Sequence, residues 1–548
     1  MPKNIVIFSD GTGQAGGLRP DQNLSNIYKL FRACRPGPES PIDPTQQVAF
    51  YDAGLGTMND EGRIPFRPIQ LFRKLWSSAT GTGISRNIVD CYEAILKHYE
   101  PGDRVFLFGF SRGAYTARCV GGVLSLCGIP TCGADGGPLP RYGQSLRRIA
   151  NEAVREVYEH GSGSNKLERR EERIEKARRF RAKYNSNNTD GQANTLPYFI
   201  GVFDTVAALG APGPRRLMMG IILAAFVALM IAIASAVLSL TPWLQFGWTY
   251  FALLVIALSV MGAKYLKTHL KTIRNFPNQG DVKRHMAAWR FRFYDNQLNP
   301  RVQYARHALA IDETRKDFMR VPWGSPTDWP ARPNGLAWLK QVWFAGNHSD
   351  VGGSYPEDES RLSDIALSWM VEQVSELPEK LQIDYQRLHL FPNANGMQHC
   401  EVQAMIDRYP AWIPKWLKLA WSQEVRRVKN DAPLHPSVLE RFRIQPGVLH
   451  FASTRPYRPQ NLAEHVLLGD FYGPPIRKSW RHTSARSRIA LMDIHAGMFL
   501  RSAALVGVNH STACASCLTA QQSTRSTPRS KGCTKFISRF SVSRQRLG

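Results

Sequence analysis

Short apolar runs alternate with amphipathic stretches along much of the chain. Residues 23–32 and 81–99 carry apolar side chains at helical spacing, which predicts a helix at each. The apolar runs themselves are rich in β-branched and aromatic residues, which is typical of buried strands. They lie at residues 4–8, 47–51, 105–108, 198–203 and 341–345. This alternation predicts an α/β fold built on a mostly parallel sheet, with helices on both faces.

Two later segments extend this pattern. Residues 363–374 predict an amphipathic helix that packs on the sheet. Residues 302–317 combine a helix-like apolar face with several charged residues, and we expect helical character there.

A second hydrophobic pattern interrupts the sheet-forming one. Residues 217–263 contain no charged side chain, and this length is enough for two spans of about 20 apolar residues. Thr241, Pro242 and Trp243 break the run in the middle, where aromatic side chains can occupy a membrane interface. The interfacial aromatics are Trp243, Trp248 and Tyr250, and the basic flanks are Arg215, Arg216, Lys264, Lys267, Lys271 and Arg274. The pattern predicts a two-helix transmembrane hairpin, with a pair of buried core helices as the alternative.

The positive flanks of this hairpin predict its orientation. Basic residues next to membrane spans favour the cytoplasmic side. Both ends of the hairpin are basic, so we expect a multi-pass membrane protein whose catalytic domain and termini are cytoplasmic.

The composition divides the chain into four parts. We expect residues 1–212 and 264–470 to form one catalytic domain, interrupted by the hairpin at 217–263. A charge-dense stretch at about 146–194 predicts a solvated helix and polar loop, either a plain surface insertion or a lid. Residues 471–548 are rich in Ser, Thr and Arg with poor apolar periodicity, which predicts a basic, disordered tail.

Charge and cysteine content narrow the function classes. The 548 residues carry a formal net charge of +26, but the excess is spread along the chain. Without a nucleic-acid-binding motif, we expect no nucleic-acid partner and assign the charge to anionic lipid headgroups. The nine cysteines are scattered, and Cys514 and Cys517 have no second pair at metal-binding spacing. Free thiols are therefore expected, and the N-terminal residues do not resemble a signal peptide.

The candidate chemistry begins where the third predicted strand ends. Gly109, Ser111 and Gly113 form a G-x-S-x-G motif between that strand and a helix-like segment. Small residues two before and two after the serine allow the strained turn that exposes a nucleophile at the top of a sheet. The alternative is a glycine-rich strand–helix connection without chemistry, but the flanking elements favour a nucleophilic serine.

Two more candidates follow predicted strands. Asp204 comes directly after residues 198–203, and His348 lies in a glycine-flanked loop after residues 341–345. Each alone has an ordinary explanation, as a helix N-cap or a structural histidine. Together they give the chain order Ser111, Asp204, His348, in which serine attacks an ester, histidine carries the proton and aspartate orients histidine.

Backbone N–H groups complete this hypothesis. The N–H of Arg112, at the start of the helix, and one from the turn at Gly11 and Thr12 are candidates for an oxyanion hole. Such chemistry needs neither a metal ion nor a cofactor.

The motifs in combination resemble a known family. FSDGTGQ, NLSNIYKL, GFSRGAYTAR, GVFDTV, YARHALAIDETRKDF and WFAGNHSDVGGSY are similar to motifs of a family of uncharacterised α/β-hydrolase domains. This family includes the catalytic domain of type VI secretion phospholipase effectors. The resemblance implies an α/β-hydrolase-like fold and a triad at Ser111, Asp204 and His348. It implies lipase or phospholipase activity for some members, and the hairpin after GVFDTV departs from the family pattern.

The sequence thus predicts a membrane-anchored serine hydrolase that cleaves carboxylic esters, with a (phospho)lipid as the expected substrate. Two alternatives stay open. One is a carboxylesterase for soluble substrates that is merely tethered to the membrane. The other is a binding or scaffold protein on an α/β-hydrolase fold without activity.

Overall fold

The computed structural model describes most of the chain up to residue 473. The described residues are 2–14, 16–17, 23–54, 82–161, 164, 166–206, 213–241, 243–287, 298–318, 320–324, 332–414, 418 and 421–473. The basic tail predicted from residue 471, with Cys514 and Cys517, lies almost wholly outside these residues. The four-part division of the chain stays a prediction.

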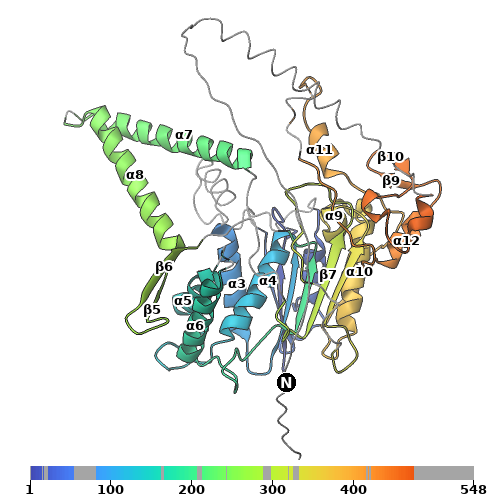
Figure 1. Cartoon of the computed structure of the whole chain (residues 1–548), viewed down its shortest axis with the longest axis horizontal. Coiled ribbons are helices and arrows are strands. Elements are labelled where there is room, and N and C mark those ends of the chain that lie inside the picture. The colour runs from blue at the N-terminus through green and yellow to red at the C-terminus, as the bar shows by residue number, and fades with distance from the viewer. Residues whose placement is uncertain are drawn as a thin grey trace, which may run out of the picture. The chain divides into compact units, whose positions relative to one another are not determined.

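A six-stranded parallel sheet forms the centre of the fold (Figure 1). Its strand order is β2-β1-β3-β4-β7-β8, and each neighbouring pair is parallel. The strands are β1 (Asn4–Ser9), β2 (Gln47–Asp52), β3 (Arg104–Phe110), β4 (Phe199–Phe203), β7 (Tyr304–Ala310) and β8 (Leu339–Phe344). The predicted α/β class with a mostly parallel sheet is confirmed.

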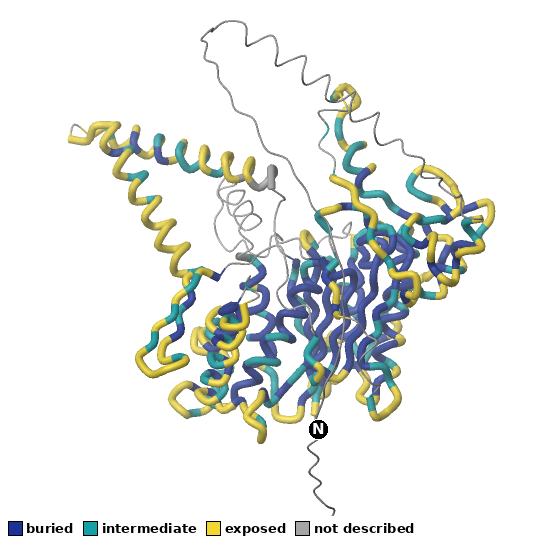
Figure 2. Tube along the Cα trace, in the orientation of Figure 1, coloured by how far each residue is buried: buried dark blue, intermediate teal, exposed yellow. Residues whose placement is uncertain are grey.

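Helices cover both faces of this sheet, because successive side chains of a strand point to opposite faces. In β1, Ile5 and Ile7 enter one hydrophobic core, whereas Val6 and Phe8 enter the other. The first core includes residues of α3 (Thr82–His98) and α4 (Arg112–Cys127). The second includes residues of α1 (Asn26–Cys34) and α10 (Arg361–Ser375). The inner strands of the sheet are therefore buried on both sides, whereas the edge strand β2 is mostly half-buried (Figure 2).

The segment for which we expected helical character contains a central strand instead. All residues of β7 are buried, including the charged Arg306 and the polar His307. The Arg306 guanidinium donates to Gln373 Oε1 at 3.0 Å and to the carbonyl of Ala305 at 2.8 Å. Polar residues that suggested a solvent-facing helix surface are thus accommodated inside the fold. The apolar periodicity was misleading because a central parallel strand is buried on both faces.

Smaller elements surround the sheet. Residues 143–184 form α5 (Gly143–Asn151), a π-helical segment (Glu152–Val157), a 3-10 turn (Tyr158–Gly161) and α6 (Leu167–Tyr184). A two-stranded antiparallel ribbon pairs β5 (Leu270–Arg274) with β6 (Val282–Met286). The others are α9 (His348–Gly352), α11 (Glu401–Asp407), α12 (Pro436–Arg443), β9 (Val448–His450), β10 (Ser453–Arg455) and 3-10 turns at Glu357–Glu359, Tyr385–Arg387, Gln460–Leu462 and Gly469–Phe471.

The charge-dense segment is not wholly solvated. Helix α6 buries Ala177, Phe180 and Tyr184 in the same core as α3 and α4. Its remaining surface carries the dense charge, with ion pairs such as that of Glu175 with Arg178.

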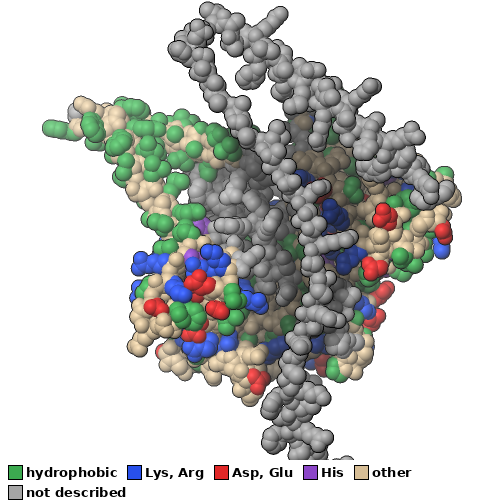
Figure 3. All heavy atoms as spheres, viewed as in Figure 1, with side chains coloured by type: hydrophobic (Ala, Val, Ile, Leu, Met, Phe, Trp, Pro, Cys, Tyr) green, Lys and Arg blue, Asp and Glu red, His purple; other side chains and the backbone are tan. Residues whose placement is uncertain are grey.

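Two long apolar helices occupy the predicted hairpin. They are α7 (Gly213–Leu238) and α8 (Phe246–His269). The segments Gly220–Leu238 and Phe246–His269 have mean hydropathies of 2.9 and 1.8. Only 6% of the first segment and 0% of the second is buried. Their exposed surface is largely hydrophobic (Figure 3). Length and composition permit each helix to cross a bilayer, while insertion and orientation stay predictions.

Candidate active site

Ser111 occupies a strained turn between β3 and α4. Its backbone has φ 59° and ψ −121°, a conformation that residues with a side chain rarely adopt. The flanking glycines make this turn possible. A Cβ on Gly109 would lie 2.4 Å from the carbonyl oxygen of Gly113, and one on Gly113 would lie 2.0 Å from that of Ser9. The G-x-S-x-G spacing therefore has a steric cause in this fold.

This close packing predicts that Gly113→Ala destabilises the protein. The added methyl group meets the backbone of β1, which cannot yield as a flexible side chain would. We expect a loss of about 2–3 kcal/mol in the free energy of unfolding, measured by denaturant unfolding of the detergent-purified protein. Gly37→Ala is the control, because nothing lies within 4 Å of a Cβ at Gly37 and its φ is not positive. Equal stability of the two variants would contradict this account of the turn.

Asp204 and His348 come together at the carboxyl ends of β4 and β8. His348 Nδ1 lies 2.5 Å from Asp204 Oδ2. Asp204 is fully buried directly after β4, and Ser111 N–H donates to the carbonyl of Phe203 at 3.1 Å. His348 begins the short helix α9, which Asn347 caps by accepting hydrogen bonds from the N–H groups of Ser349 and Asp350. The carboxyl edge of a parallel sheet is where ligands bind in α/β folds.

The other ring nitrogen of His348 has no hydrogen-bond partner among the described residues. His348 Nε2 is buried and unpartnered, and no hydrogen bond joins it to Ser111. The imidazole packs between the rings of Phe110, at 4.7 Å, and Phe318, at 5.1 Å between centroids. Phe110 immediately precedes Ser111, so the ring lies beside the turn. A proton on Nδ1, donated to Asp204, leaves Nε2 with a lone pair that can accept a proton.

Arg426 is part of this site, and sequence reasoning missed it. Its guanidinium donates to Asp204 Oδ1 at 2.6 Å and to Oδ2 at 3.0 Å. The backbone N–H of Ala310 also donates to Oδ1, at 3.1 Å. Burial alone would raise the pKa of Asp204, but the Arg426 charge and the His348 hydrogen bond hold it well below its usual range. Asp204 therefore stays ionised.

A second ion pair supports His348 from its backbone. The buried carboxylate of Glu313 accepts the His348 N–H at 3.2 Å and pairs with Arg315 at 2.7 Å. Arg315 lies over the ring of Phe318, 3.6 Å from its centroid. These residues belong to the segment YARHALAIDETRKDF, so the motif itself was the signal that they matter.

The predicted oxyanion donors have different environments. Arg112 is the first residue of α4, so its N–H is among those that a helix leaves without an intrahelical acceptor. The turn at Gly11 lies beside Ser111, since a Cβ there would be 3.5 Å from Ser111 Cβ. The Gly11 N–H already donates to Asp10 Oδ1 at 2.6 Å, whereas Thr12 N–H donates to no other described residue. Arg112 and Thr12 are therefore the better candidates.

The environment of His348 predicts the acid side of the pH–activity profile. Burial lowers the pKa of His348 below its ordinary 6.5, while the Asp204 carboxylate opposes this shift. A base must be neutral, so activity is lost as the pH falls through this pKa. We expect kcat/KM to fall at acid pH with a midpoint below pH 6.5. Near-ultraviolet circular dichroism at each pH verifies that the protein is folded. A midpoint above 6.5 in folded protein would contradict a buried imidazole base.

Comparisons with known proteins found partial similarities to this chain. A stretch of an uncharacterized protein of Saccharomyces cerevisiae is 31% identical over 136 residues, which is 24% of this chain and 19% of the yeast protein. A crystal structure of an uncharacterized protein from Pseudomonas aeruginosa aligns with 16% identity and a TM-score of 0.30, covering 71% of this chain and 48% of that one. The Tle1 effector bound to the VgrG spike of the type VI secretion system aligns with 17% identity and a TM-score of 0.25, covering 66% and 53%.

The chain thus spans about half of each solved relative and about a fifth of the yeast protein. The family profile described as T6SS, phospholipase effector Tle1-like, catalytic domain matches residues 3–245 and 255–373, which is more than half of the chain. The chain belongs to the family of Tle1-like phospholipase effector catalytic domains.

Proposed function

We propose that this protein is a membrane-anchored serine hydrolase that cleaves a carboxylic ester of phospholipids. The observation that carries the proposal is the buried Asp204–His348 pair at the sheet edge where Ser111 occupies its strained turn. Membership of a phospholipase effector family supports the lipid substrate.

Acyl transfer would begin at Ser111. Its Oγ attacks the ester carbonyl carbon, and its proton passes to His348 Nε2. The ionised Asp204 stabilises the resulting imidazolium, and the N–H groups of Arg112 and Thr12 donate to the oxyanion. The C–O bond to the glycerol oxygen then breaks, and His348 returns its proton to that oxygen. The products of this half are a lysophospholipid and an acyl-enzyme.

Water completes the cycle by the same path in reverse. His348 Nε2 takes a proton from water as the hydroxide oxygen attacks the acyl carbon. The bond to Ser111 Oγ breaks, and His348 returns the proton to that oxygen. A fatty acid leaves, and no metal ion or redox cofactor enters the balance.

The apolar helices would hold this site at a lipid surface. Helices α7 and α8 present large exposed apolar side chains, such as Leu217, Trp248 and Val260. Lys264 and Lys267 lie near the end of α8, where anionic headgroups would attract them. Tethering removes the need for the substrate to diffuse through water. Alkaline carbonate extraction of membranes tests the anchor, since an inserted protein stays in the pellet.

Hydrolysis of phospholipid vesicles tests the activity. Detergent-purified full-length protein is incubated with vesicles, and the products are identified by mass spectrometry. The proposal is supported if the protein releases fatty acid and lysophospholipid from vesicles faster than it releases acid from a short soluble ester. Turnover of the soluble ester alone would identify a tethered carboxylesterase. Failure on both substrates, with no labelling by a fluorophosphonate, would identify a binding protein.

A further inference from the structure

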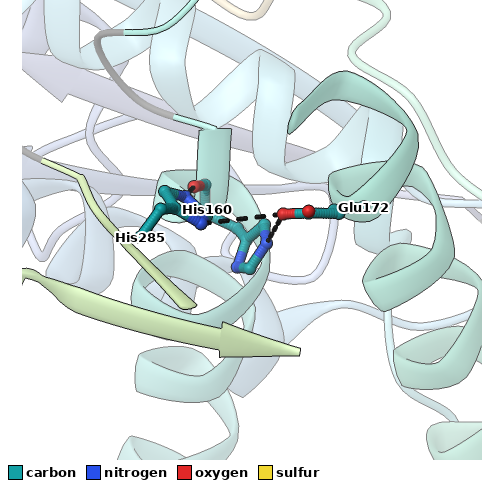
Figure 4. Close-up of side chains that lie close together, drawn as sticks. All are labelled: His160, Glu172 and His285. Atoms are coloured by element: carbon teal, nitrogen blue, oxygen red, sulfur yellow. Dashed lines mark hydrogen bonds and ion pairs between the residues drawn. The ribbon is translucent and has the colours of Figure 1, made fainter. Parts of the chain in front are cut away.

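A cluster of two histidines and a glutamate lies outside the candidate active site. His160 comes from the 3-10 turn before α6, Glu172 from α6 and His285 from β6 (Figure 4). One nitrogen or oxygen of each side chain lies within 4.8 Å of the other two. The side chains of His160 and Glu172 are fully buried and that of His285 is 10% exposed. The candidate triad makes no use of them.

One ring nitrogen of His285, Nδ1, has no hydrogen-bond partner and lies near Glu172. Its Nε2 lies 2.6 Å from the backbone carbonyl oxygen of His160. A carbonyl oxygen only accepts, so Nε2 carries the proton and Nδ1 of the neutral ring has a lone pair. This Nδ1 is buried without a hydrogen-bond partner and lies 3.6 Å from Glu172 Oε2. Two electron-rich atoms thus face each other, which is unfavourable unless a cation lies between them.

The remaining contacts resemble the outer shell of a metal site. A backbone carbonyl that fixes the tautomer of a ligating histidine is a common second-shell interaction. Glu172 is held in the same way, because its Oε1 accepts a hydrogen bond from Arg169 at 2.6 Å and leaves Oε2 to face the histidines. The carbonyl hydrogen-bonded to His285 Nε2 selects the neutral tautomer in which Nδ1 is free to bind a metal. Neutral imidazole is the form that binds metal.

We propose that His160, Glu172 and His285 bind a Zn²⁺ ion. Two imidazoles and one carboxylate are a donor set that Zn²⁺ accepts, with the fourth tetrahedral position left for water. Donor atoms around Zn²⁺ with bonds of about 2.0–2.1 Å lie about 3.4 Å apart. His160 Nε2 and His285 Nδ1 lie 2.8 and 3.6 Å from Glu172 Oε2, and the three donor atoms lie within 4.8 Å of one another, so the side chains need to shift by about 1 Å to reach this geometry. The His160 proton would move from Nε2 to Nδ1, with no proton released.

The position of the site suggests a structural role. Helix α8 ends at His269, and the chain continues directly into β5 and β6, which carry His285. Lys283 of β6 pairs with Glu168 of α6 at 2.9 Å, and Lys271 of β5 donates to the carbonyl of Arg155. A Zn²⁺ ion bound by α6 and β6 would add to this attachment. It would fix the ribbon that leads out of the apolar hairpin against the catalytic domain.

Zinc binding by the full-length protein tests the proposal. Detergent-purified protein is stripped with a chelator and dialysed against Zn²⁺, and bound metal is measured by mass spectrometry. We expect about one Zn²⁺ per chain, and a rise in melting temperature on addition of Zn²⁺. Co²⁺ in the same site should give visible absorption of a four-coordinate ion without a thiolate charge-transfer band.

Three variants separate this site from adventitious binding. His285→Ala removes one ligand, and Glu172→Gln keeps the size and much of the hydrogen bonding while removing the carboxylate. Both should bind Zn²⁺ at least about 100-fold more weakly and lose the rise in melting temperature. His389→Ala removes an exposed histidine elsewhere and should behave as wild type. Wild-type protein without stoichiometric Zn²⁺, or a folded Glu172→Gln variant that binds it equally well, would overturn the proposal.

Discussion

Replacing Ser111 with alanine is expected to reduce phospholipid hydrolysis by about 10³–10⁶-fold. In the proposed mechanism the Ser111 hydroxyl supplies the oxygen that forms the acyl-enzyme, and alanine has no such atom. The backbone strain at φ 59° is the same for alanine and serine, so the turn should persist. The rate of fatty acid release from vesicles and labelling by a fluorophosphonate should be lost together.

Ser125→Ala provides a matched control on the same helix. Its hydroxyl donates to the carbonyl of Gly121 at 2.8 Å and has no part in the candidate site. This variant should keep wild-type activity. Unchanged hydrolysis by Ser111→Ala would mean that another group is the nucleophile, and the proposed function would then need a different site.

Replacing Asp204 with asparagine should lower kcat by about 10⁴-fold. The carboxylate Oδ1 accepts hydrogen bonds from Arg426 and Ala310, so the asparagine oxygen should occupy that position. The NH₂ group then faces His348 Nδ1, where it can only donate. His348 must accept at Nδ1 and carry its proton on Nε2, which leaves no lone pair for the Ser111 proton. Steady-state kinetics should show the loss in kcat rather than in KM.

Asp364→Asn distinguishes this effect from the loss of any buried carboxylate. Asp364, on α10, is also fully buried, and its carboxylate pairs with the Lys29 ammonium at 2.9 Å. This variant should lower the melting temperature because it leaves the buried Lys29 ammonium with Glu357 as its remaining carboxylate partner, while kcat per folded molecule is retained. An Asp204→Asn variant with kcat within tenfold of wild type would contradict the orienting role.

The ion pair of Arg426 with Asp204 could not be predicted from local sequence. It lies in a stretch without regular secondary structure, and many arginines of this basic chain have similar neighbours. Its role depends on its guanidinium reaching a carboxylate that is more than two hundred residues away in the sequence. The same reason hid the cluster of His160, Glu172 and His285, whose members lie on three different elements.

Residue pattern alone determined five of the six strands of the sheet, the strained serine turn and the two long apolar helices of this protein. These features depend on local physical chemistry: side-chain periodicity, the steric freedom of Gly109 and Gly113, and the absence of charge over a membrane-length segment. The chain order of Ser111, Asp204 and His348 could also be stated, because each follows a strand.

Tertiary structure decided what surrounds these residues. Only the parallel order of the sheet brings the ends of β4 and β8 together, so that Asp204 and His348 meet. Burial on both faces of the sheet also explains why β7 was mistaken for a helix, since Arg306 donates to neutral acceptors such as Gln373 inside the fold. Hydrogen-bond partners and burial are properties of distant residues packed together, and local sequence does not contain them.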